Sequence, residues 1–578
     1  MFFKYDVTFD LNGGVAGDGF AETVTVKHGE TVSMSIPTME NFTFVGWFDG
    51  SVQYTESTPI EKDVTLVAKW EFNNTYTLTF ETNGMADVPV AYPIIGELPK
   101  IPQTPIVEGY VFAGWYFDAE YTTRYFFDYP LTEATTLYAK FYDLSLGEYI
   151  VISNVEQLMA IKDDPTAKYL LACDINCKGE TLTPIDEFTG EIDGNGYRIF
   201  NFDISEDANN VAFICTNIGT IRNLTFDNFT YNVLVNGGAR EKYYGVVCGI
   251  NHGSIENCHV LNGDMKIDYT RLSDVEAFVS GIVGFNCGTV SKCTNKVSIT
   301  VFSFADEDRG GYIFNSYVGG ICGFMDSEAK LVDSINYGDI QVNCDSDGYG
   351  HNYIALGGVV GCANGYVDKT INLGNLNINS TNSKLTHLYL GGHVGRSNGG
   401  TIKNSYAECD IVVDNPGTQS TSDNMIGGFV GYNSGKIYNC YSSVDIKDKD
   451  TQYKAAGLFA GYNELLSDHE SLINKCFAFG SIELTNAPID VGYFVGLSTG
   501  TVKDSYYCDA YTMTLVTTTV TEGENPETIE TREPIEATNN IGEAKAESVI
   551  LSLDFLENTL YFDRMVWFLV DGKLPELR

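Results

Sequence analysis

The stretch Ile426-Gly-Gly-Phe-Val-Gly-Tyr-Asn-Ser-Gly-Lys-Ile-Tyr-Asn-Cys-Tyr441 recurs with substitutions from about residue 211 to about residue 508. In almost every copy a glycine follows an apolar pair, and this marker glycine returns every 30 to 39 residues. A period of this size indicates stacked supersecondary units, none of which can bury its apolar face alone. The markers are Gly249, Gly284, Gly323, Gly361, Gly395, Gly431, Gly461 and Gly496, with Cys215 in the same place in an earlier copy.

The aligned columns of the repeat indicate strands rather than helices. The residue before the marker is small and apolar, as in Val394, Val430 and Ala460, and we expect these three side chains to point inward and stack. Ile or Val stands about six residues after the marker, and Cys, Ser or Thr stands three residues further on. Because side chains three apart face opposite sides of a straight strand, the chain must bend between these columns if both face inward. The pattern predicts a parallel β-solenoid with one coil per repeat and nine coils in all.

Asparagine stands two residues after the marker in several copies, and glycine often follows it two residues later. We interpret this position as a corner that needs either a left-handed backbone or a ladder of side chains. In the copy at Gly323 the corner is replaced by Met325 and the residues after it, so we expect an irregular coil there. The asparagines are Asn217, Asn251, Asn286, Asn433 and Asn463, the last without its glycine.

The repeated string resembles the GLUG repeat, which is found in bacterial surface proteins and beside the catalytic domain of some immunoglobulin A peptidases. The resemblance covers roughly residues 148 to 578 and implies a right-handed solenoid with a helical cap over its first coil. Ser153-Asn-Val-Glu156 reads as a capping box, so we expect a helix at about residues 153–163. The segment from Trp567 to Leu577 resembles the closing segment of the family, and we expect it to form a second cap.

Residues 1–142 contain a different repeat, whose period from Trp47 to Trp115 is 68 residues. Each copy opens on an alternating strand that ends in Asn-Gly, has Gly-Trp near its middle, and closes on Ala-Lys followed by an aromatic residue. These features resemble the Listeria–Bacteroides repeat, the internalin B-repeat, which implies a small β-grasp-like fold found in tandem on Gram-positive surface proteins. We expect both tryptophans to lie in cores. Phe141 closes the second copy where the family usually has Trp, a change that should alter packing and not the fold.

These patterns predict an all-β chain of three parts. The first two are Listeria–Bacteroides repeats at residues 1–71 and 72–142. The third, residues 143–578, is a GLUG-type β-solenoid that begins with a short joint at 143–150. Within it we expect an N-terminal cap at about 148–204, coils at about 205–511, a disordered Thr- and Glu-rich insertion at 512–547, and a C-terminal cap at 548–578.

The chain is strongly acidic, with 35 Lys and Arg against 77 Asp and Glu, a formal charge of −42 and a pI of about 4.3. Such a chain repels phosphate backbones and anionic lipids, so nucleic-acid partners are disfavoured. It has no apolar run of about 18 residues, so we expect no membrane insertion. Its first residues do not look like a signal peptide. Two alternatives follow: the protein is intracellular, or the chain is a piece of a longer secreted protein. The repeats favour the second, with a bacterial cell-surface or secreted location.

Two turns could hold a cation. Asp193 lies in an Asp-Gly-Asn-Gly turn with a single carboxylate, and we favour a tight turn with Asx hydrogen bonds over a metal site. Asn343, Asp345 and Asp347 imitate the first half of an EF-hand loop, but Ile354 occupies the position that needs a bidentate Glu. We predict no metal site and no cofactor.

Catalytic motifs are missing from the sequence. His469 and Glu470 form its one His-Glu pair, and Ile473 stands where a zinc protease needs the second His. Neither a Gly-x-Ser-x-Gly elbow nor a phosphate loop is present. Cys258 with Cys293, and Cys440 with Cys476, would lie on adjacent coils within disulfide range, but Ser and Thr in the same column favour buried thiols.

We therefore expect a non-catalytic surface protein that serves in adhesion or display, as an adhesin or stalk. The expected partner is a protein or glycan of unknown identity, bound through the loops at 300–317, 343–353 and 411–425, because core columns are committed to packing. The alternative is the accessory region of a larger secreted enzyme, a peptidase or a polysaccharide-active enzyme, whose catalytic domain is not in this chain.

Overall fold

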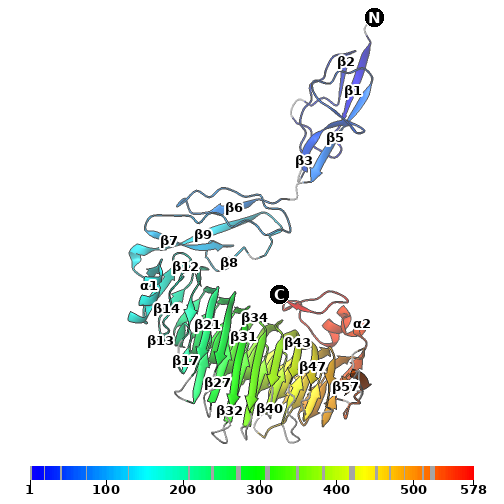
Figure 1. Cartoon of the computed structure of the whole chain (residues 1–578). Coiled ribbons are helices and arrows are strands. Elements are labelled where there is room, and N and C mark those ends of the chain that lie inside the picture. The colour runs from blue at the N-terminus through cyan, green and yellow to red at the C-terminus, as the bar shows by residue number, and fades with distance from the viewer. Residues whose placement is uncertain are drawn as a thin grey trace. The chain divides into compact units, whose positions relative to one another are not determined.

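The computed structural model shows a chain that is mostly β-structure and that divides between Ser145 and Leu146 into two compact units (Figure 1). The division falls inside the joint predicted at residues 143–150. The structure describes residues 3–17, 20–39, 42–72, 75–127, 129–205, 208–235, 240–268, 275–305, 313–346, 351–380, 385–414, 423–449, 453–467, 470–486, 489–510, 513–520, 528–539 and 541–578. Among these residues no helix has the length and apolar character needed to cross a membrane.

The first Listeria–Bacteroides-like repeat forms a small mixed sheet. Its central strands β1 and β5 run parallel, and the outer pairs β1–β2, β3–β5 and β3–β4 run antiparallel. Trp47 is 2% exposed and packs edge-on against Phe9, with ring centroids 4.8 Å apart, so the predicted core role of this tryptophan is confirmed. The strands are β1 (Lys4–Asp10), β2 (Thr23–Lys27), β3 (Phe42–Asp49), β4 (Val52–Tyr54) and β5 (Val64–Phe72).

The second repeat forms a similar sheet in the order β6-β9-β7-β8. Trp115 is 3% exposed and lies 4.8 Å from Phe80, which confirms its core role. Phe141 contacts Phe112 at 5.7 Å, much as Trp70 contacts Phe44 at 5.4 Å in the first repeat. The strands are β6 (Leu78–Glu81), β7 (Tyr110–Tyr116), β8 (Arg124–Tyr125) and β9 (Thr135–Asp143).

Residues 146–578 form a parallel β-solenoid with three stacks of strands. The nine marker residues from Cys215 to Gly496 fall one on each strand of the stack from β18 to β54, so these described strands span eight turns. The strands of this marker stack are β13 (Ile185–Phe188), β18 (Ile214–Asn217), β23 (Cys248–Asn251), β28 (Val283–Asn286), β33 (Cys322–Met325), β37 (Val360–Ala363), β41 (Val394–Ser397), β45 (Val430–Asn433), β49 (Ala460–Asn463) and β54 (Val495–Ser498).

A second stack precedes the marker strand in each coil. Its strands are β17 (Asn210–Val211), β22 (Glu241–Tyr244), β27 (Val275–Ser280), β32 (Ile313–Gly319), β36 (His351–Gly357), β40 (Leu385–Gly391), β44 (Met425–Gly427), β48 (Ala455–Gly457) and β53 (Asp490–Gly492). The third stack belongs to one long sheet that runs from β10 (Ile150–Ile152) to β59 (Glu543–Lys545). It includes β31 (Ser298–Ala305), β34 (Lys330–Asn336), β35 (Ile340–Ser346), β43 (Tyr406–Asp414) and β47 (Tyr441–Lys449).

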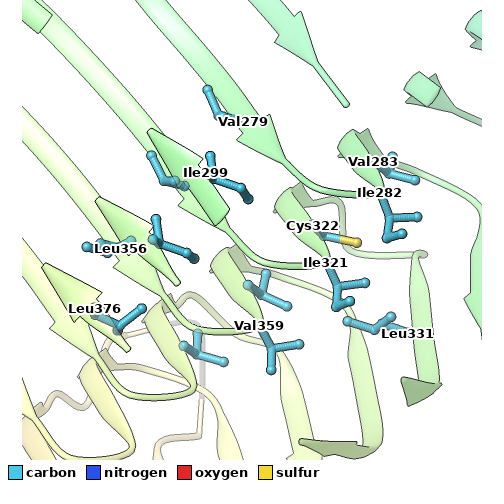
Figure 2. Close-up of a cluster of buried hydrophobic side chains, with 14 of the residues drawn as sticks. Val279, Ile282, Val283, Ile299, Ile321, Cys322, Leu331, Leu356, Val359 and Leu376 are labelled. Carbon is cyan, nitrogen blue, oxygen red and sulfur yellow. The ribbon is translucent and has the colours of Figure 1, made fainter. Parts of the chain in front are cut away.

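Aliphatic side chains fill the interior, one layer per coil. Figure 2 shows Ile282, Ile321 and Val359 from successive coils lying in one row. Val430 pairs in register with Val394 and Ala460, and all three are fully buried, so the predicted inward stacking is confirmed. The marker is glycine because the two stacks approach closely there: a Cβ on Gly431 would lie 2.4 Å from the backbone nitrogen of Leu390.

The asparagine corner is a side-chain ladder. Asn217 Nδ2 donates to Asn251 Oδ1, and Asn251 Nδ2 donates to Asn286 Oδ1, both at 2.8 Å. The left-handed backbone lies instead in the residue before the Cys/Ser/Thr column, where φ is between 44° and 57°. This residue provides the bend that lets both inward columns face the core. It is Asn257, Lys292, Asp333, Lys369, Asn404, Asn439, Lys475 or Asp504 in successive coils.

The coil at Gly323 is regular, so the prediction of an irregular coil is wrong. Strand β33 pairs in register with β28 and β37, and Met325 is fully buried opposite Asn286. A second ladder replaces the missing asparagine in these coils, because Asn295 donates to Asn336 and Asn336 donates to Asn372, each at 2.8 Å.

The N-terminal cap is helical, as predicted, but its capping residue differs. Helix α1 (Val155–Met159) continues into a 3₁₀ turn (Ala160–Asp163), and Leu158 and Ile161 are buried in the solenoid core. The N-cap is Asn154, whose side chain accepts from the Gln157 backbone N–H at 2.9 Å, while Gln157 Oε1 accepts from the Ser153 backbone N–H at 2.7 Å. The box is thus displaced by one residue from the predicted Ser153–Glu156 pair.

The segment 512–547, predicted as a disordered insertion, contains regular structure among its described residues. Strand β57 (Met513–Val520) extends the sheet beyond β52 (Ile482–Leu484) and turns back as β58 (Thr528–Pro534). Thr538 exchanges hydrogen bonds with the Val491 backbone at 2.8 and 2.9 Å, and Asn539 Nδ2 donates to the Gly496 carbonyl at 2.5 Å. This segment therefore covers the backbone groups of the last coil. Composition misled the prediction, because threonine favours strands as well as polar loops.

The C-terminal segment packs on the flank of the solenoid, along aromatic rings of several coils, and its role as a second cap stays a prediction. Tyr406 and Tyr441, on β43 and β47, stack at 4.7 Å, and Phe477 on the next coil continues the stack at 4.9 Å. Trp567 is fully buried against these tyrosines, and Tyr441 Oη donates to the Pro575 carbonyl at 2.7 Å. The segment contains α2 (Glu547–Ile550), β60 (Trp567–Phe568) and β61 (Glu576–Leu577).

Candidate functional site

The Asp193 turn is held by protein groups. The Asp193 side chain is 6% exposed. Its carboxylate accepts from the Asn195 backbone N–H at 2.8 Å and from Asn223 Nδ2 at 3.0 Å, and it pairs with Arg222 at 3.0 Å. Asn195 has φ 55°. These contacts are those of an Asx turn closed by a cation from the protein, which is the interpretation that the sequence favoured.

The EF-hand-like stretch does not form a loop where it is described. Asn343 and Asp345 lie on strand β35, and Ile354 is 2% exposed on β36. Asp347 and Gly348 lie outside the described residues. Asn343 Oδ1 accepts from Gln341 Nε2 at 3.0 Å and from Asn379 Nδ2 at 3.3 Å. Within the described ranges no group of three or more His, Cys, Asp or Glu side chains is placed to hold a metal ion.

The cysteine column consists of buried thiols. Cys258, Cys293, Cys440 and Cys476 are free and fully buried, and burial raises the pKa of the Cys258 and Cys440 thiols well above its usual value. A thiol in this state is a poor nucleophile. Of the His-Glu pair, His469 lies outside the described residues, and Glu470 is paired with Lys436 at 2.8 Å.

Most of the described residues of the three predicted binding loops lie on strands. Residues 300–305 belong to β31 and 313–317 to β32, while the other two stretches are divided in the same way between β35 and β36 and between β43 and β44. Residues 306–312, 347–350 and 415–422 lie outside the described residues. Binding through these loops stays a prediction.

A row of aromatic rings, here called the aromatic strip, runs along the outside of the solenoid where the second stack meets the marker stack. None of its rings belongs to the main core cluster. Neighbouring rings touch from one end to the other, with centroid separations of 5.0 to 5.9 Å. The strip consists of Tyr243, Phe278, Phe285, Tyr317, Phe324, Tyr353, Tyr389, Tyr432 and Tyr462.

The two halves of the strip differ in geometry. In the first half Tyr243, Phe278 and Tyr317 stack almost parallel, with interplanar angles of 15° and 9°, so their faces are occupied by one another. From Tyr317 onward each ring is tilted against the next by 50° to 81°. Tyr353 and Tyr389 in this second half are half-buried, so part of each ring remains exposed to solvent.

Polar groups border the strip. Tyr243 Oη donates to Glu241 and Tyr432 Oη donates to Glu464, each at 2.5 Å. Burial and these neighbouring carboxylates raise the pKa of both tyrosines, which keeps the hydroxyls protonated. Lys454 lies 5.7 Å from the Tyr462 ring and is paired with Asp423 at 3.0 Å.

Arg396 is the cation at the centre of the second half of the strip. Its Nη1 donates to Tyr353 Oη at 2.9 Å, and its guanidinium carbon lies 5.6 Å from the Tyr389 ring and 5.2 Å from the Tyr432 ring. Burial acts to lower the pKa of Arg396, but the neighbouring phenol of Tyr353 and thiol of Cys362 outweigh it, and the pKa is raised. The side chain is therefore a permanent cation among aromatic rings.

The strip was missed by the sequence reasoning, although its signal is present. One column stands directly after the marker and reads Phe285, Phe324, Cys362, Arg396, Tyr432 and Tyr462 in successive coils. A second column stands six residues before the marker and reads Tyr243, Phe278, Tyr317, Ala355 and Tyr389. The register of the strands brings these two columns side by side.

Two known families match parts of this chain. The Listeria-Bacteroides repeat domain matches residues 5–69 and 76–140, and the GLUG motif matches residues 422–447. The chain therefore carries two Listeria–Bacteroides repeats followed by a β-solenoid that contains a GLUG motif, as its sequence predicted.

Several known proteins are similar to segments of this chain. Internalin H of Listeria monocytogenes is 34% identical over 147 residues, which are 24% of this chain and 25% of the relative. A protein of Evansella cellulosilytica, whose name describes a membrane protein, is 32% identical over 153 residues, 25% of this chain and 22% of that protein. This chain thus spans a quarter or less of the length of these relatives. A solved structure named IgA1 Protease is 10% identical, with a TM-score of 0.27 over 91% of this chain and 30% of that chain, too low a score to support an argument.

Proposed function

We propose that this chain is a non-catalytic part of a bacterial cell-surface protein and that its solenoid binds a saccharide chain along the aromatic strip. The observation that supports this proposal is the row of aromatic rings that runs across successive coils, bordered by carboxylates and a guanidinium. Tyr317, Tyr353 and Tyr389 in this row are half-buried, and Tyr432 is buried. Aromatic rings pack against the apolar faces of sugars, and carboxylate and guanidinium groups bond their hydroxyls. A surface that repeats from coil to coil suits a ligand that is itself a repeating polymer.

The surface location is supported by the accompanying modules. The chain carries Listeria–Bacteroides repeats, and its relatives include an internalin and a protein with a membrane-protein name. In this proposal the two N-terminal sheets act as stalk units, and the solenoid acts as an adhesin. The acidic surface of the chain disfavours nucleic acid as the ligand.

The competing proposal is an accessory region of a larger secreted enzyme. It is compatible with the comparisons, because the matched segments cover a quarter or less of the relatives. Under either proposal the chain by itself is expected to bind and not to cleave. Release of reducing ends or unsaturated sugars by the purified chain would place it among the enzymes instead.

The test is a titration of the purified chain with a panel of soluble polysaccharides, followed by calorimetry. The double variant Tyr353→Ala/Tyr389→Ala, which removes two half-buried rings, should lose most of the binding. Tyr337→Ala is the matched control, because Tyr337 is 43% exposed but follows strand β34 of the third stack, away from the strip. If the strip variant bound as tightly as the unmodified chain, or if the control lost as much, the aromatic strip would not be the binding surface.

A further inference from the structure

Arg396 has an unusual position for a cation in this protein. The chain contains 77 Asp and Glu and 35 Lys and Arg, so carboxylates far outnumber the basic side chains. Lys436, Lys454 and Arg532, for example, each lie within 3.0 Å of a carboxylate oxygen. No carboxylate of the described residues lies within 4.0 Å of Arg396. Its one direct hydrogen bond, to Tyr353 Oη, is to a neutral hydroxyl.

The donors of Arg396 that remain unused lie on one edge of the guanidinium. Nη1 donates to Tyr353, and Nε is buried, so neither nitrogen is open to a ligand. Nη2 has no hydrogen-bond partner in the described part of the chain, and it is not among the buried atoms. Nη2 is therefore the donor that an acceptor from solvent can reach. A hydrogen bond from a guanidinium to a carboxylate is charge-assisted and stronger than one between neutral groups.

The surroundings of this edge suit a sugar that carries the acceptor. Tyr389 and Tyr432 flank the guanidinium with tilted rings. The nearest acidic groups already have partners, because Asp423 pairs with Lys454 and Glu464 accepts from Tyr432. An anion at Arg396 would therefore meet a cation and two rings, although the chain as a whole is negative. At physiological ionic strength the repulsion from more distant charges is screened over about 8 Å.

From this geometry we infer that the saccharide bound by the strip carries a carboxylate, and that Arg396 binds this carboxylate through Nη2. The inference rests on the proposed function and adds the ligand class and the residue that selects it. The tilted rings contribute affinity for any sugar, and Arg396 supplies the preference for acidic over neutral sugars.

The test measures binding of the full chain to a panel of uronic-acid oligosaccharides, each paired with its methyl ester, which has the same sugar backbone without the charge. The acid should bind at least about tenfold more tightly than its ester, as expected for a charge-assisted hydrogen bond. Arg396→Gln should abolish this difference and should weaken the binding of the acid more than that of the ester. Arg396→Lys should restore only part of the difference, because lysine keeps the charge but not the planar guanidinium that Tyr353 orients. Arg564→Gln, a change in an exposed arginine of the C-terminal segment, is the control and should change neither affinity.

Other outcomes separate this inference from the proposed function. If acid and ester bound equally well and Arg396→Gln had no effect, while Tyr353→Ala/Tyr389→Ala weakened the binding of both, the strip would bind saccharides whatever their charge. The inference would then fail and the proposed function would stand. Tighter binding of a sulfated saccharide, or of a glutamate-rich peptide, would overturn the carboxylated-sugar assignment. Binding of no member of the panel would overturn both. Circular dichroism melting of each variant shows whether a loss of binding reflects unfolding, and Arg396→Lys serves if Arg396→Gln does not fold.

Discussion

Asn251 Nδ2 donates a hydrogen bond to Asn286 Oδ1 over 2.8 Å, with both side chains fully buried. Asn217 donates to Asn251 in the same way, and the bond recurs between Asn433 and Asn463. Each amide thus satisfies the next inside the core, which buried polar groups require. The ladder also holds adjacent coils in register, because a slip of one residue would break every one of these bonds.

The ladder should be worth a measurable part of the stability. Asn251→Leu keeps the approximate volume but removes the acceptor of Asn217 and the donor of Asn286, so it should lower the free energy of unfolding by about 1–3 kcal/mol. Urea denaturation followed by circular dichroism measures this change. Asn232→Ala, at an exposed position of strand β21 (Phe229–Leu234), is the control and should change stability little. Equal stabilities of the Leu variant and the unmodified chain would show that the ladder is not stabilising.

The inward column can be tested at Val430, which is fully buried between Val394 and Ala460. Val430→Ala should cost about 1–3 kcal/mol, as buried large-to-small changes do, and Val430→Asp should unfold the neighbouring coils because it buries an unpaired charge. Val412 is 40% exposed, so Val412→Ala provides a control with the same chemical change. A Val430→Asp protein with an unchanged melting temperature would refute the inward position.

His393 predicts a dependence of stability on pH. It is fully buried and stacked on Phe429 at 4.6 Å, and burial lowers its pKa from 6.5 to about 3. Below pH 6.5 the unfolded chain binds a proton at this histidine and the folded chain does not, so stability falls as the pH falls towards 3. The loss should be about 1.4 kcal/mol per pH unit in that window.

The variant His393→Phe isolates this contribution, because Phe429, Phe459 and Phe494 occupy the same column in the next coils and stack at 4.9 Å. Thr370, which bonds His393 at 2.9 Å, keeps Ser405 as a partner at 3.1 Å. The variant should therefore lose less stability than the unmodified chain between pH 6.5 and pH 4. Parallel pH profiles for the two proteins would contradict the prediction.

A change at Trp567 should release the C-terminal segment from the flank of the solenoid. This side chain is fully buried against Tyr406 and Tyr441, so Trp567→Ala should cost about 3–5 kcal/mol of local stability and free the segment from residue 547 onward. Limited proteolysis should then cut in this segment before it cuts the coils. Phe568 is 52% exposed, and Phe568→Ala should leave the cleavage pattern unchanged. First cuts inside the coils of the Trp567 variant would mean that the segment supports the whole solenoid.

The two units should fold independently. The chain divides between Ser145 and Leu146, and Leu146 is 74% exposed at this point. A protein of residues 146–578 should therefore melt at the same temperature as the solenoid transition of the full chain, measured by calorimetry. Limited proteolysis of the full chain should cut near residue 145. A shorter chain that melts markedly lower would show that the repeats stabilise the solenoid.

The sequence by itself determined the repeating core, because a strand pattern is local. The shared place before the marker assigned Val394, Val430 and Ala460 to the interior. The shared Gly-Trp position of the two Listeria–Bacteroides repeats assigned Trp47 and Trp115 to their cores. The marker glycine was found as a regularity, and the structure supplied its reason, the close approach of two stacks at Gly431. For the asparagine column the sequence left two interpretations open, since ladder and left-handed corner use the same residue type.

Only the tertiary structure decided which surfaces are free and which are covered. Trp567 lies more than a hundred residues from Tyr441 in the chain, and no local sequence pattern predicts their contact. The rings of Tyr389 and Tyr432 meet Arg396 because two columns with different positions in the repeat are brought together at the junction of two stacks. Strand register is encoded by the repeat, but the contacts across a junction depend on how the coil bends, and that bend is a property of the stacked coils together.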